Sequence, residues 1–155
     1  MSEQSSSGVP TKIVVGTDGS PTAERAVSKA TALARAVGAE LVIVCAYNNR
    51  APSGVAAAGI SLDSGWVAAA HSGAESVAKA AGEKAKAEGV ENLSYHAVPG
   101  DPSEVLLQVT TEQGADLLVV GSKGMQSTAR FLLGPIANKV SRRVPCDLLI
   151  VETSE

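Results

Sequence analysis

Aromatic residues are scarce in this chain: its 155 residues include one Trp, two Tyr and one Phe. Proteins that bind single-stranded nucleic acid stack the bases on aromatic side chains, so this scarcity argues against that class. The net charge of -3 and the pI near 5.4 argue against a protein that coats DNA or RNA. The core must be built from Val, Leu, Ile and Ala, and the length suits one domain.

Long apolar runs and a leader-like start are also lacking. No apolar run approaches the roughly 20 residues that a helix needs to span a membrane. The first ten residues, MSEQSSSGVP, are polar, which is not the pattern of a secretory signal peptide. We therefore expect no membrane segment, a disordered arm over residues 1–10 and a single domain over residues 11–155.

Cysteine is also rare, with two residues in the chain. Cys45 and Cys146 each lie in or beside an apolar, strand-like run, and their separation fits no metal motif. We interpret them as reduced core residues of a cytoplasmic protein rather than as redox groups.

Several catalytic motifs are missing. The sequence has no GxxxxGK loop followed by Ser or Thr, no GxGxxG after its first apolar run and no GxSxG nucleophile elbow. His71 and His96 lack the spacing of metal ligands or of triad partners. Asp18 stands alone after the first apolar run, so the paired acids of a phospho-receiver are absent there. We expect a binding protein rather than an enzyme, with no catalytic residues and no metal site.

The sequence does have a regular alternation of short apolar runs and longer amphipathic segments. Such runs predict buried strands, and the segments between them predict helices. The predicted strands cover residues 12–17, 40–47, 93–98, 116–120 and 147–152. The predicted helices cover about 21–37, 67–88, 102–113 and 135–143. This α/β alternation predicts a parallel sheet with helices on both faces. The segment 48–65 is a long loop that either closes over a ligand or forms a strap.

Capping residues mark the ends of the predicted helices. Ser20 is expected to cap the first helix, and Gly38 is expected to end it. Asp101 is expected to cap a later helix, with Glu104 completing a capping box.

Two glycine-bearing turns follow the first and fourth predicted strands, at the edge where parallel sheets bind ligands. The second turn contains Gly121 and Gly124, and Gly134 precedes the last helix. Glycines allow the backbone to approach a ligand closely, and a helix start offers free N–H groups to an anion. Residues 121–143 also hold five cations and no Asp or Glu, which favours an anionic ligand. Those cations are Lys123, Arg130, Lys139, Arg142 and Arg143. An ordinary turn beside a solvated helix face is the alternative interpretation.

Along nearly its whole folded length, the chain resembles the universal stress protein family. The resemblance is carried by IVVGTDGSPTAERAV, ADLLVVGSKG and LLGPIANKVSRRVPCDLLIVET. The family's nucleotide motif is Gly, two residues, Gly, nine residues, then Gly followed by Ser or Thr, and the three glycines above match this spacing. The resemblance implies a Rossmann-like fold of the adenine nucleotide alpha hydrolase type, with a five-stranded parallel sheet of order 3-2-1-4-5. It also implies homodimers that pair through the last strand, residues 147–152.

The resemblance further implies a cleft for an adenine nucleotide (ATP, AMP or cyclic AMP), with or without magnesium. Thr17 and Asp18 would approach the ribose and phosphates, and the backbone around Ala46 would hydrogen-bond the adenine. Asp18 could instead serve only as a cap for the following helix. The implied nucleotide-binding positions are Gly16, Thr17, Asp18, Ala46, Val120, Gly121, Lys123, Gly124, Gly134, Pro135, Ile136 and Ala137.

The chain departs from the family motif at the phosphate end. Pro135 stands where the motif has Ser or Thr, and Ala137 offers no hydroxyl. Hydrogen bonds to charged groups contribute roughly 1.5 to 3 kcal/mol each, so losing two donors weakens phosphate binding by about two orders of magnitude or more. We therefore expect AMP or cyclic AMP to be preferred over ATP. The expected role is a cytoplasmic stress-response sensor or regulator. The alternatives are a nucleotide-independent dimeric interaction module and a slow ATPase that uses Asp18 as its base.

Overall fold

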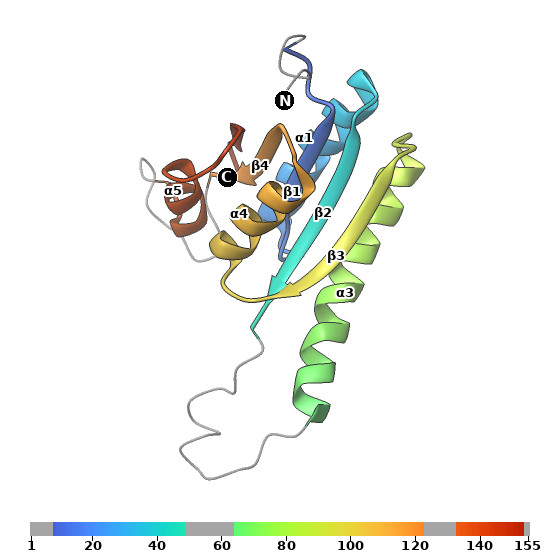
Figure 1. Ribbon diagram of the computed structural model, residues 1–155. Helices are drawn as coiled ribbons and strands as arrows, with labels where there is room; N and C mark the ends of the chain where they lie inside the picture. Colours follow the sequence, from blue (N-terminus) through green and yellow to red (C-terminus); the bar gives the residue numbers. More distant parts are fainter. Residues whose placement is uncertain (1–7, 49–63, 123–132, 154–155) are drawn as a thin grey trace.

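All five strands lie in one parallel sheet of order β3-β2-β1-β4-β5 (Figure 1). This computed structural model describes residues 8–48, 64–122 and 133–153, and it confirms the fold and the strand order that the resemblance implied. The strands are β1 Lys12–Gly16, β2 Glu40–Tyr47, β3 Leu93–Pro99, β4 Leu117–Gly121 and β5 Asp147–Val151. The described helices are α1 Pro21–Val37, α3 Ser64–Ala87, α4 Pro102–Gln113 and α5 Pro135–Ser141.

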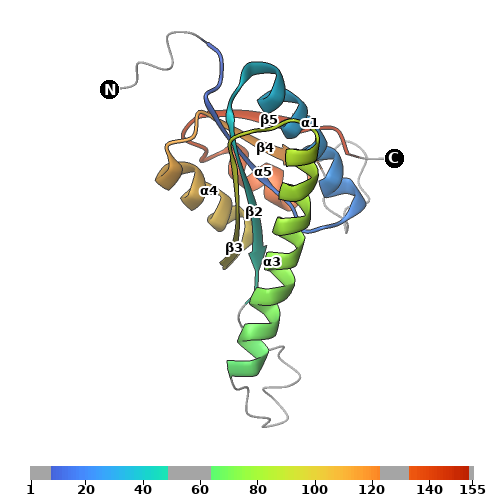
Figure 2. The ribbon, with the colours of Figure 1, turned by 90° about the vertical axis from the view of Figure 1, so that its right-hand side faces the viewer.

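Helices cover both faces of the sheet, as the apolar character of the strands predicted (Figure 2). Alternate strand residues point to opposite faces. Ile13 and Val15 of β1 therefore pack with α1 and α3, whereas Val14 packs with α4 and α5. All three side chains are fully buried. The central strands are thus held from both sides, which fixes the position of their carboxyl ends.

The predicted helix caps are present. The Ser20 hydroxyl accepts a hydrogen bond from the Ala23 N–H at 3.2 Å, and Gly38 ends α1 in the left-handed conformation with a φ of 72°. The Asp101 carboxylate accepts from the Glu104 N–H at 3.1 Å. The capping box predicted for Glu104 is wrong in one respect, because its carboxylate contacts helix α5 instead of turning back to the Asp101 backbone.

Some element boundaries differ from the prediction for local reasons. Helix α3 begins at Ser64, three residues before the predicted start. Helix α5 ends at Ser141 rather than near residue 143, because Pro145 lies close behind and cannot continue a helix. Strand β4 begins after Asp116, whose carboxylate accepts hydrogen bonds from the Thr11 and Lys12 N–H groups at the start of β1. Burial alone would raise the pKa of Asp116, but these hydrogen bonds outweigh it and hold the pKa below its ordinary value.

The two cysteines are free thiols in different surroundings. Cys45 is buried and Cys146 is half-buried. Burial, and secondarily the charge of Asp18, raises the pKa of the Cys45 thiol. Burial, with Asp147 and Asp116, raises the pKa of Cys146 to about 11. Both thiols therefore stay protonated at neutral pH, which makes them poor nucleophiles.

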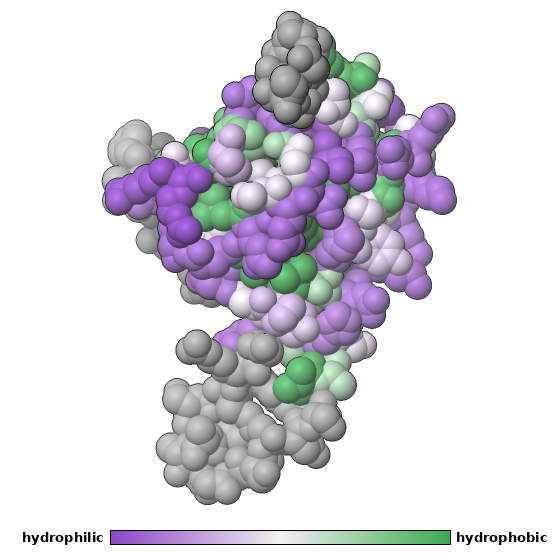
Figure 3. All heavy atoms as spheres, viewed as in Figure 1, coloured by the Kyte–Doolittle hydropathy of each residue, from purple (hydrophilic) through white to green (hydrophobic). Residues whose placement is uncertain are grey.

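Hydrophilic side chains cover most of the described surface in the view of Figure 3, and apolar groups show as separate patches. The described part of the chain contains no helix with the length and apolar character needed to cross a membrane.

Candidate functional site

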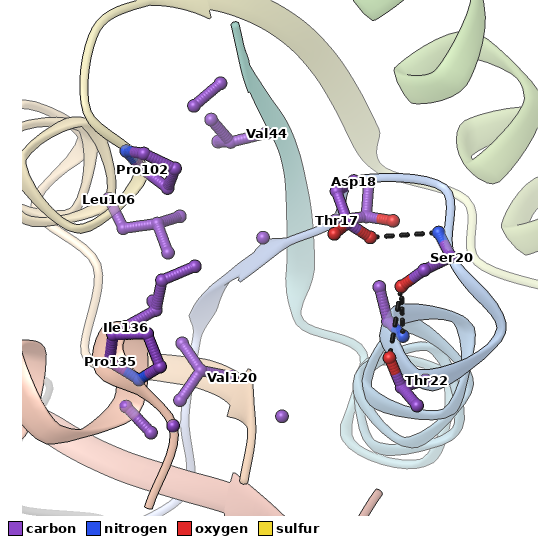
Figure 4. A pocket seen from close by; sticks show the side chains of 16 residues that line it. Thr17, Asp18, Ser20, Thr22, Val44, Pro102, Leu106, Val120, Pro135 and Ile136 are labelled. Carbon is purple, nitrogen blue, oxygen red and sulfur yellow. Dashed lines mark hydrogen bonds between the residues drawn. The ribbon is translucent and has the colours of Figure 1, made fainter. Parts of the chain in front are cut away.

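A pocket opens at the carboxyl ends of β1, β2 and β4, between the starts of helices α1, α4 and α5 (Figure 4). It holds about 780 Å³ of empty space, part of which is open to solvent. The pocket is lined by Gly16, Thr17, Asp18, Ser20, Thr22, Ala23, Val44, Ala46, Pro102, Leu106, Val120, Gly121, Gly134, Pro135, Ile136 and Ala137. Parallel sheets commonly bind ligands at such a position.

The turn after β1 forms the polar side of the pocket. Its backbone stays tied to the sheet, because the Thr17 N–H donates to the Val44 carbonyl at 2.9 Å. The Thr17 hydroxyl accepts from the Gly19 N–H at 3.1 Å, and Asp18 Oδ1 accepts from the Ser20 N–H at 2.9 Å. The Asp18 carboxylate thus stabilises the turn that presents Ser20, while Ser20 itself caps α1. Asp18 still lines the pocket, so one carboxylate serves the turn and faces the cavity.

Gly16 allows helix α4 to approach the end of β1. A Cβ atom built on Gly16 would lie 2.9 Å from the Leu106 side chain, which is too close for a real contact. The absence of a side chain at this position therefore lets Leu106 form part of the pocket wall. Gly19 has a φ of 83°, a conformation that a residue with a side chain rarely adopts, and it packs against Val77 of α3.

The opposite side of the pocket is apolar. Figure 4 shows Pro102 and Leu106 of α4 together with Val120, Pro135 and Ile136, facing the hydroxyl-bearing turn across the cavity. Such a combination of an apolar wall and a few polar groups is typical of small-molecule sites.

The start of α5 forms the wall beside β4. The Gly134 N–H donates to the Ser122 carbonyl at 2.7 Å, which brings the start of α5 back to the end of β4. Gly134 is the N-cap residue and supplies no side-chain hydrogen bond, and Pro135 occupies the first turn. The Asn138 N–H already bonds to the Gly134 carbonyl. The backbone N–H groups of Ile136 and Ala137 are therefore the donors that this helix start could offer to a ligand.

Two of the cations predicted to face an anionic ligand are engaged elsewhere. Lys139 Nζ lies 3.0 Å from Glu104 Oε2 and 3.7 Å from Asp101 Oδ2, and Arg143 Nη1 lies 2.7 Å from Glu104 Oε2. Hydrogen bonds from Arg143 and then Lys139 hold the pKa of Glu104 below its ordinary value. The pKa of Asp101 is lowered chiefly by the Ser103 hydroxyl. These cations thus join α5 to α4 and add little field to the pocket.

The histidines lie apart from the pocket. His71 Nδ1 is 3.0 Å from the Tyr47 hydroxyl, and His96 Nε2 is 3.1 Å from the Ser94 hydroxyl. Among the residues that the structure describes, no group of three or more His, Cys, Asp and Glu side chains could hold a metal ion.

Comparison with known proteins decides the family. The profile of the universal stress protein family matches residues 10–152. The chain belongs to the universal stress protein family. It is 37% identical over 142 residues to the universal stress protein Rv1636 of Mycobacterium tuberculosis H37Rv, covering 92% of this chain and 96% of the relative. It is 31% identical over 144 residues to a putative universal stress protein of Staphylococcus haemolyticus, with 92% and 85% covered.

Solved structures of universal stress proteins share this fold. One, a universal stress protein in complex with cAMP, is 35% identical with a TM-score of 0.70, covering 94% of this chain and 99% of that one. The universal stress protein UspA from Lactobacillus plantarum has a TM-score of 0.76 at 21% identity, covering 91% and 97%, and supports the fold alone.

The pocket of this universal stress protein brings together every predicted site residue that the structure describes. These are Gly16, Thr17, Asp18, Ala46, Val120, Gly121, Gly134, Pro135, Ile136 and Ala137. Lys123 and Gly124 lie outside the described residues, as does most of the loop predicted over 48–65. The nucleotide-binding role of all these positions stays a prediction.

Six lining residues were not predicted as part of the site: Ser20, Thr22, Ala23, Val44, Pro102 and Leu106. Ser20 and Pro102 carried a signal, since both mark helix starts at the carboxyl edge of the sheet. Val44 and Leu106 carried none, because an apolar residue in a strand or helix looks like any other core residue.

Proposed function

We propose that this universal stress protein binds an adenine nucleotide with a single phosphate, AMP or cyclic AMP, in the pocket at the carboxyl ends of β1, β2 and β4. The observation that carries the proposal is the pocket itself. It sets the Thr17–Asp18 turn opposite an apolar wall and places Gly121 and Gly134 at one end. The related universal stress protein in complex with cAMP supports the choice of ligand class.

The two sides of the pocket suit the parts of such a ligand. The apolar wall formed by Leu106, Val120 and Ile136 would pack against the purine, while the backbone around Ala46 hydrogen-bonds its edge. Thr17 and Asp18 would contact the ribose hydroxyls. The phosphate would then lie toward Gly121 and the start of α5, where the Ile136 and Ala137 N–H groups are available.

The phosphate end favours one phosphate over three. Pro135 has neither an N–H nor a hydroxyl, and Gly134 supplies no side-chain donor. Lys139 and Arg143 are bound to Glu104 rather than directed to the pocket. Each further phosphate would carry charge into a region whose described part offers few donors, and desolvating such charge without partners is unfavourable.

Magnesium fits this site only with a longer phosphate chain. Asp18 is the one carboxylate among the described lining residues. Protein-bound magnesium usually takes one or two carboxylates together with substrate phosphates. We therefore assign no magnesium to the complex with AMP or cyclic AMP, and we place Asp18 beside the ion if ADP or ATP is bound.

The proposed role is that of a cytoplasmic stress-response sensor or regulator, not an enzyme. It would act as a homodimer that pairs through β5, which is an edge strand of the sheet in the single chain. Asp18 is the best-placed base for a slow ATPase, but its Oδ1 atom already accepts a hydrogen bond from the Ser20 N–H. Turnover of ATP that disappears in Asp18→Ala would contradict the non-enzymatic role.

A second candidate function is a dimeric interaction module that needs no nucleotide. It is favoured by the paired state of Lys139 and Arg143 and by the lack of a side-chain donor at Gly134 and Pro135. In that case the pocket would be a remnant, and contacts with other proteins would carry the function.

Isothermal titration calorimetry on nucleotide-stripped protein tests the proposal, with ATP, ADP, AMP and cyclic AMP as ligands. We expect AMP or cyclic AMP to bind more tightly than ATP, and Gly121→Ala to weaken binding by about tenfold, because a methyl group would stand at the pocket wall. Gly73→Ala is the matched control, since a Cβ atom there meets nothing within 4 Å on an exposed part of α3. Absence of binding by all four ligands to folded protein would favour the interaction module.

A further inference from the structure

Ser122, directly after the last residue of β4, is a junction of three segments. It is buried, with 9% of its surface exposed. Its N–H donates to the Val151 carbonyl at 2.7 Å, and its carbonyl accepts from the Gly134 N–H at 2.7 Å. Its hydroxyl donates to Glu152 Oε1 at 3.0 Å and accepts from the Thr153 N–H at 3.1 Å.

These bonds connect the pocket to the chain that follows β5. Gly121, the neighbour of Ser122 in sequence, and Gly134, its hydrogen-bond partner, both line the pocket. Glu152 and Thr153, which we call the C-terminal segment, follow β5 and bond to the Ser122 hydroxyl. The wall of the pocket and the end of the edge strand therefore share one anchoring residue.

The hydroxyl group is the part of this junction that a substitution can remove. Thr153 is fully buried. When its N–H loses the Ser122 hydroxyl, water cannot easily replace the lost acceptor, and a buried donor left without a partner is unfavourable. Glu152 and Thr153 would then lose their bonds to the Ser122 hydroxyl, while the backbone bonds of Ser122 to Val151 and Gly134 would remain. The support behind Gly121 and Gly134 would therefore weaken.

We propose that Ser122 is a positioning residue that couples occupancy of the pocket to the order of the C-terminal segment. This inference rests on the proposed function, because it takes the occupant to be AMP or cyclic AMP. A ligand against Gly121 and Gly134 holds Ser122 in place, and Ser122 in turn holds the Thr153 N–H. Coupling between two sites is reciprocal. If the ligand stabilises the Ser122–Thr153 bond by some factor, that bond strengthens ligand binding by the same factor, and loss of the bond must weaken ligand binding.

The first test compares two serine-to-alanine variants by calorimetry with cyclic AMP. Ser122→Ala should weaken binding by about tenfold, the equivalent of one buried hydrogen bond to the positioning network. Ser141→Ala is the control, because the Ser141 hydroxyl donates to the Asn138 carbonyl of its own helix and Ser141 is not among the described residues that line the pocket. Its affinity should stay within about twofold of the wild type. Equal affinity of Ser122→Ala and wild type would overturn the inference.

The second test needs no substitution, so it holds even if Ser122→Ala does not fold. Amide hydrogen exchange is measured by NMR on the full chain, with and without saturating cyclic AMP. The Thr153 amide should exchange more slowly in the complex, whereas the Ala39 amide, bonded to the Ala34 carbonyl away from the pocket, should not change. Unchanged exchange at Thr153 in a protein that does bind cyclic AMP would overturn the coupling alone. Absence of any binding to the wild type would instead overturn the proposed function, and this inference with it.

Discussion

Pro135 is the single residue that most separates this chain from the nucleotide motif of its family. It sits in the first turn of α5 and lines the pocket, but it brings neither a hydroxyl nor an N–H. This departure is local, since Gly121 and Gly134 line the same pocket. The side chain at position 135 is therefore expected to set how many phosphates the site tolerates.

Replacing Pro135 by serine tests this expectation. Pro135→Ser returns one hydroxyl and one N–H to the pocket wall, and we expect the affinity for ATP to rise about tenfold, the equivalent of one hydrogen bond to a charged group. The affinity for cyclic AMP should change less, because in the proposed complex its single phosphate would already accept from the N–H groups of Ile136 and Ala137. Calorimetry with both ligands measures the two changes.

The control for this change is Pro21→Ser, the same replacement at the start of α1 and outside the pocket lining. It should leave both affinities as they are while accounting for any general loss from removing a proline at a helix start. An ATP affinity that does not increase in Pro135→Ser would show that the missing donors are not what limits triphosphate binding.

Among the elements, α4 and α5 are joined by charge as well as by apolar packing. Lys139 and Arg143 converge on Glu104, and the starts of both helices line the pocket. The pKa of Glu104 is lowered from 4.5, and that of Lys139 is raised from 10.5. The contribution of these ion pairs to the stability of the folded protein is therefore complete between pH 4.5 and pH 10.5. It is lost in acid as the pH falls through the folded pKa of Glu104, and in base as the pH rises through that of Lys139.

Glu104→Gln should therefore lower the melting temperature at pH 7. The difference in melting temperature between this variant and the wild type should become smaller as the pH falls to 3. The effect should be small and should shrink in high salt, because the three side chains are about half exposed. Glu112→Gln is the matched control on the same helix, since Glu112 bonds to Gln108 within α4. A difference that is as large at pH 3 as at pH 7 would show that the carboxylate charge is not the cause.

The elements also show which parts of the structure the sequence could predict. The bounds of α1 and α4 match the prediction, because each has a capping side chain before it and a glycine after it. The start of α3 was missed because residues 48–65 show no clear helical period, so Asp63, a residue type that can cap a helix, was counted with the loop before it. The strand order came from the resemblance and not from the periodicity, which cannot tell which strands are neighbours.

For the site, too, features that are local in the sequence could be predicted and contacts between distant elements could not. The glycines and Asp18 could be predicted because their positions follow from turns that are local in sequence. The pairing of Lys139 with Glu104 could not, because it depends on α4 and α5 lying side by side, 35 residues apart along the chain. The expectation that the cations of residues 121–143 act on an anionic ligand therefore does not hold for Lys139 and Arg143, which pair with Glu104. A count of charges along a segment says nothing about the acids that another helix brings to it.

For the whole molecule, the open question is what covers the edges of the sheet. Strands β3 and β5 form the two edges, and an uncovered edge strand can pair with another chain. Leu148, Leu149 and Ile150 of β5 are only half-buried in the single chain. At the other edge, Tyr95 of β3 is 37% exposed and packs its ring over Gly82 of α3. Strand β5 carries an unbroken apolar run, whereas Ser94 and His96 interrupt that of β3, and this difference favours β5 as the edge that pairs.

A lysine placed in β5 or in β3 distinguishes a dimer contact at one edge of the sheet from a contact at the other. Wild-type protein should be a dimer by light scattering at tens of micromolar, and Leu148→Lys should raise the dimer dissociation constant by about tenfold or more, because an unpaired ammonium group would have to be buried. Tyr95→Lys should remain a dimer, with circular dichroism showing that both variants are folded. A wild-type monomer would contradict the homodimer, whereas a monomer in Tyr95→Lys alone would place the contact at β3.

The position of the dimer contact also matters for the pocket. Strand β5 leads into the C-terminal segment that bonds to Ser122, and Ser122 lies beside Gly121 and bonds to Gly134. A partner on β5 would therefore lie next to the residue that supports this wall of the pocket.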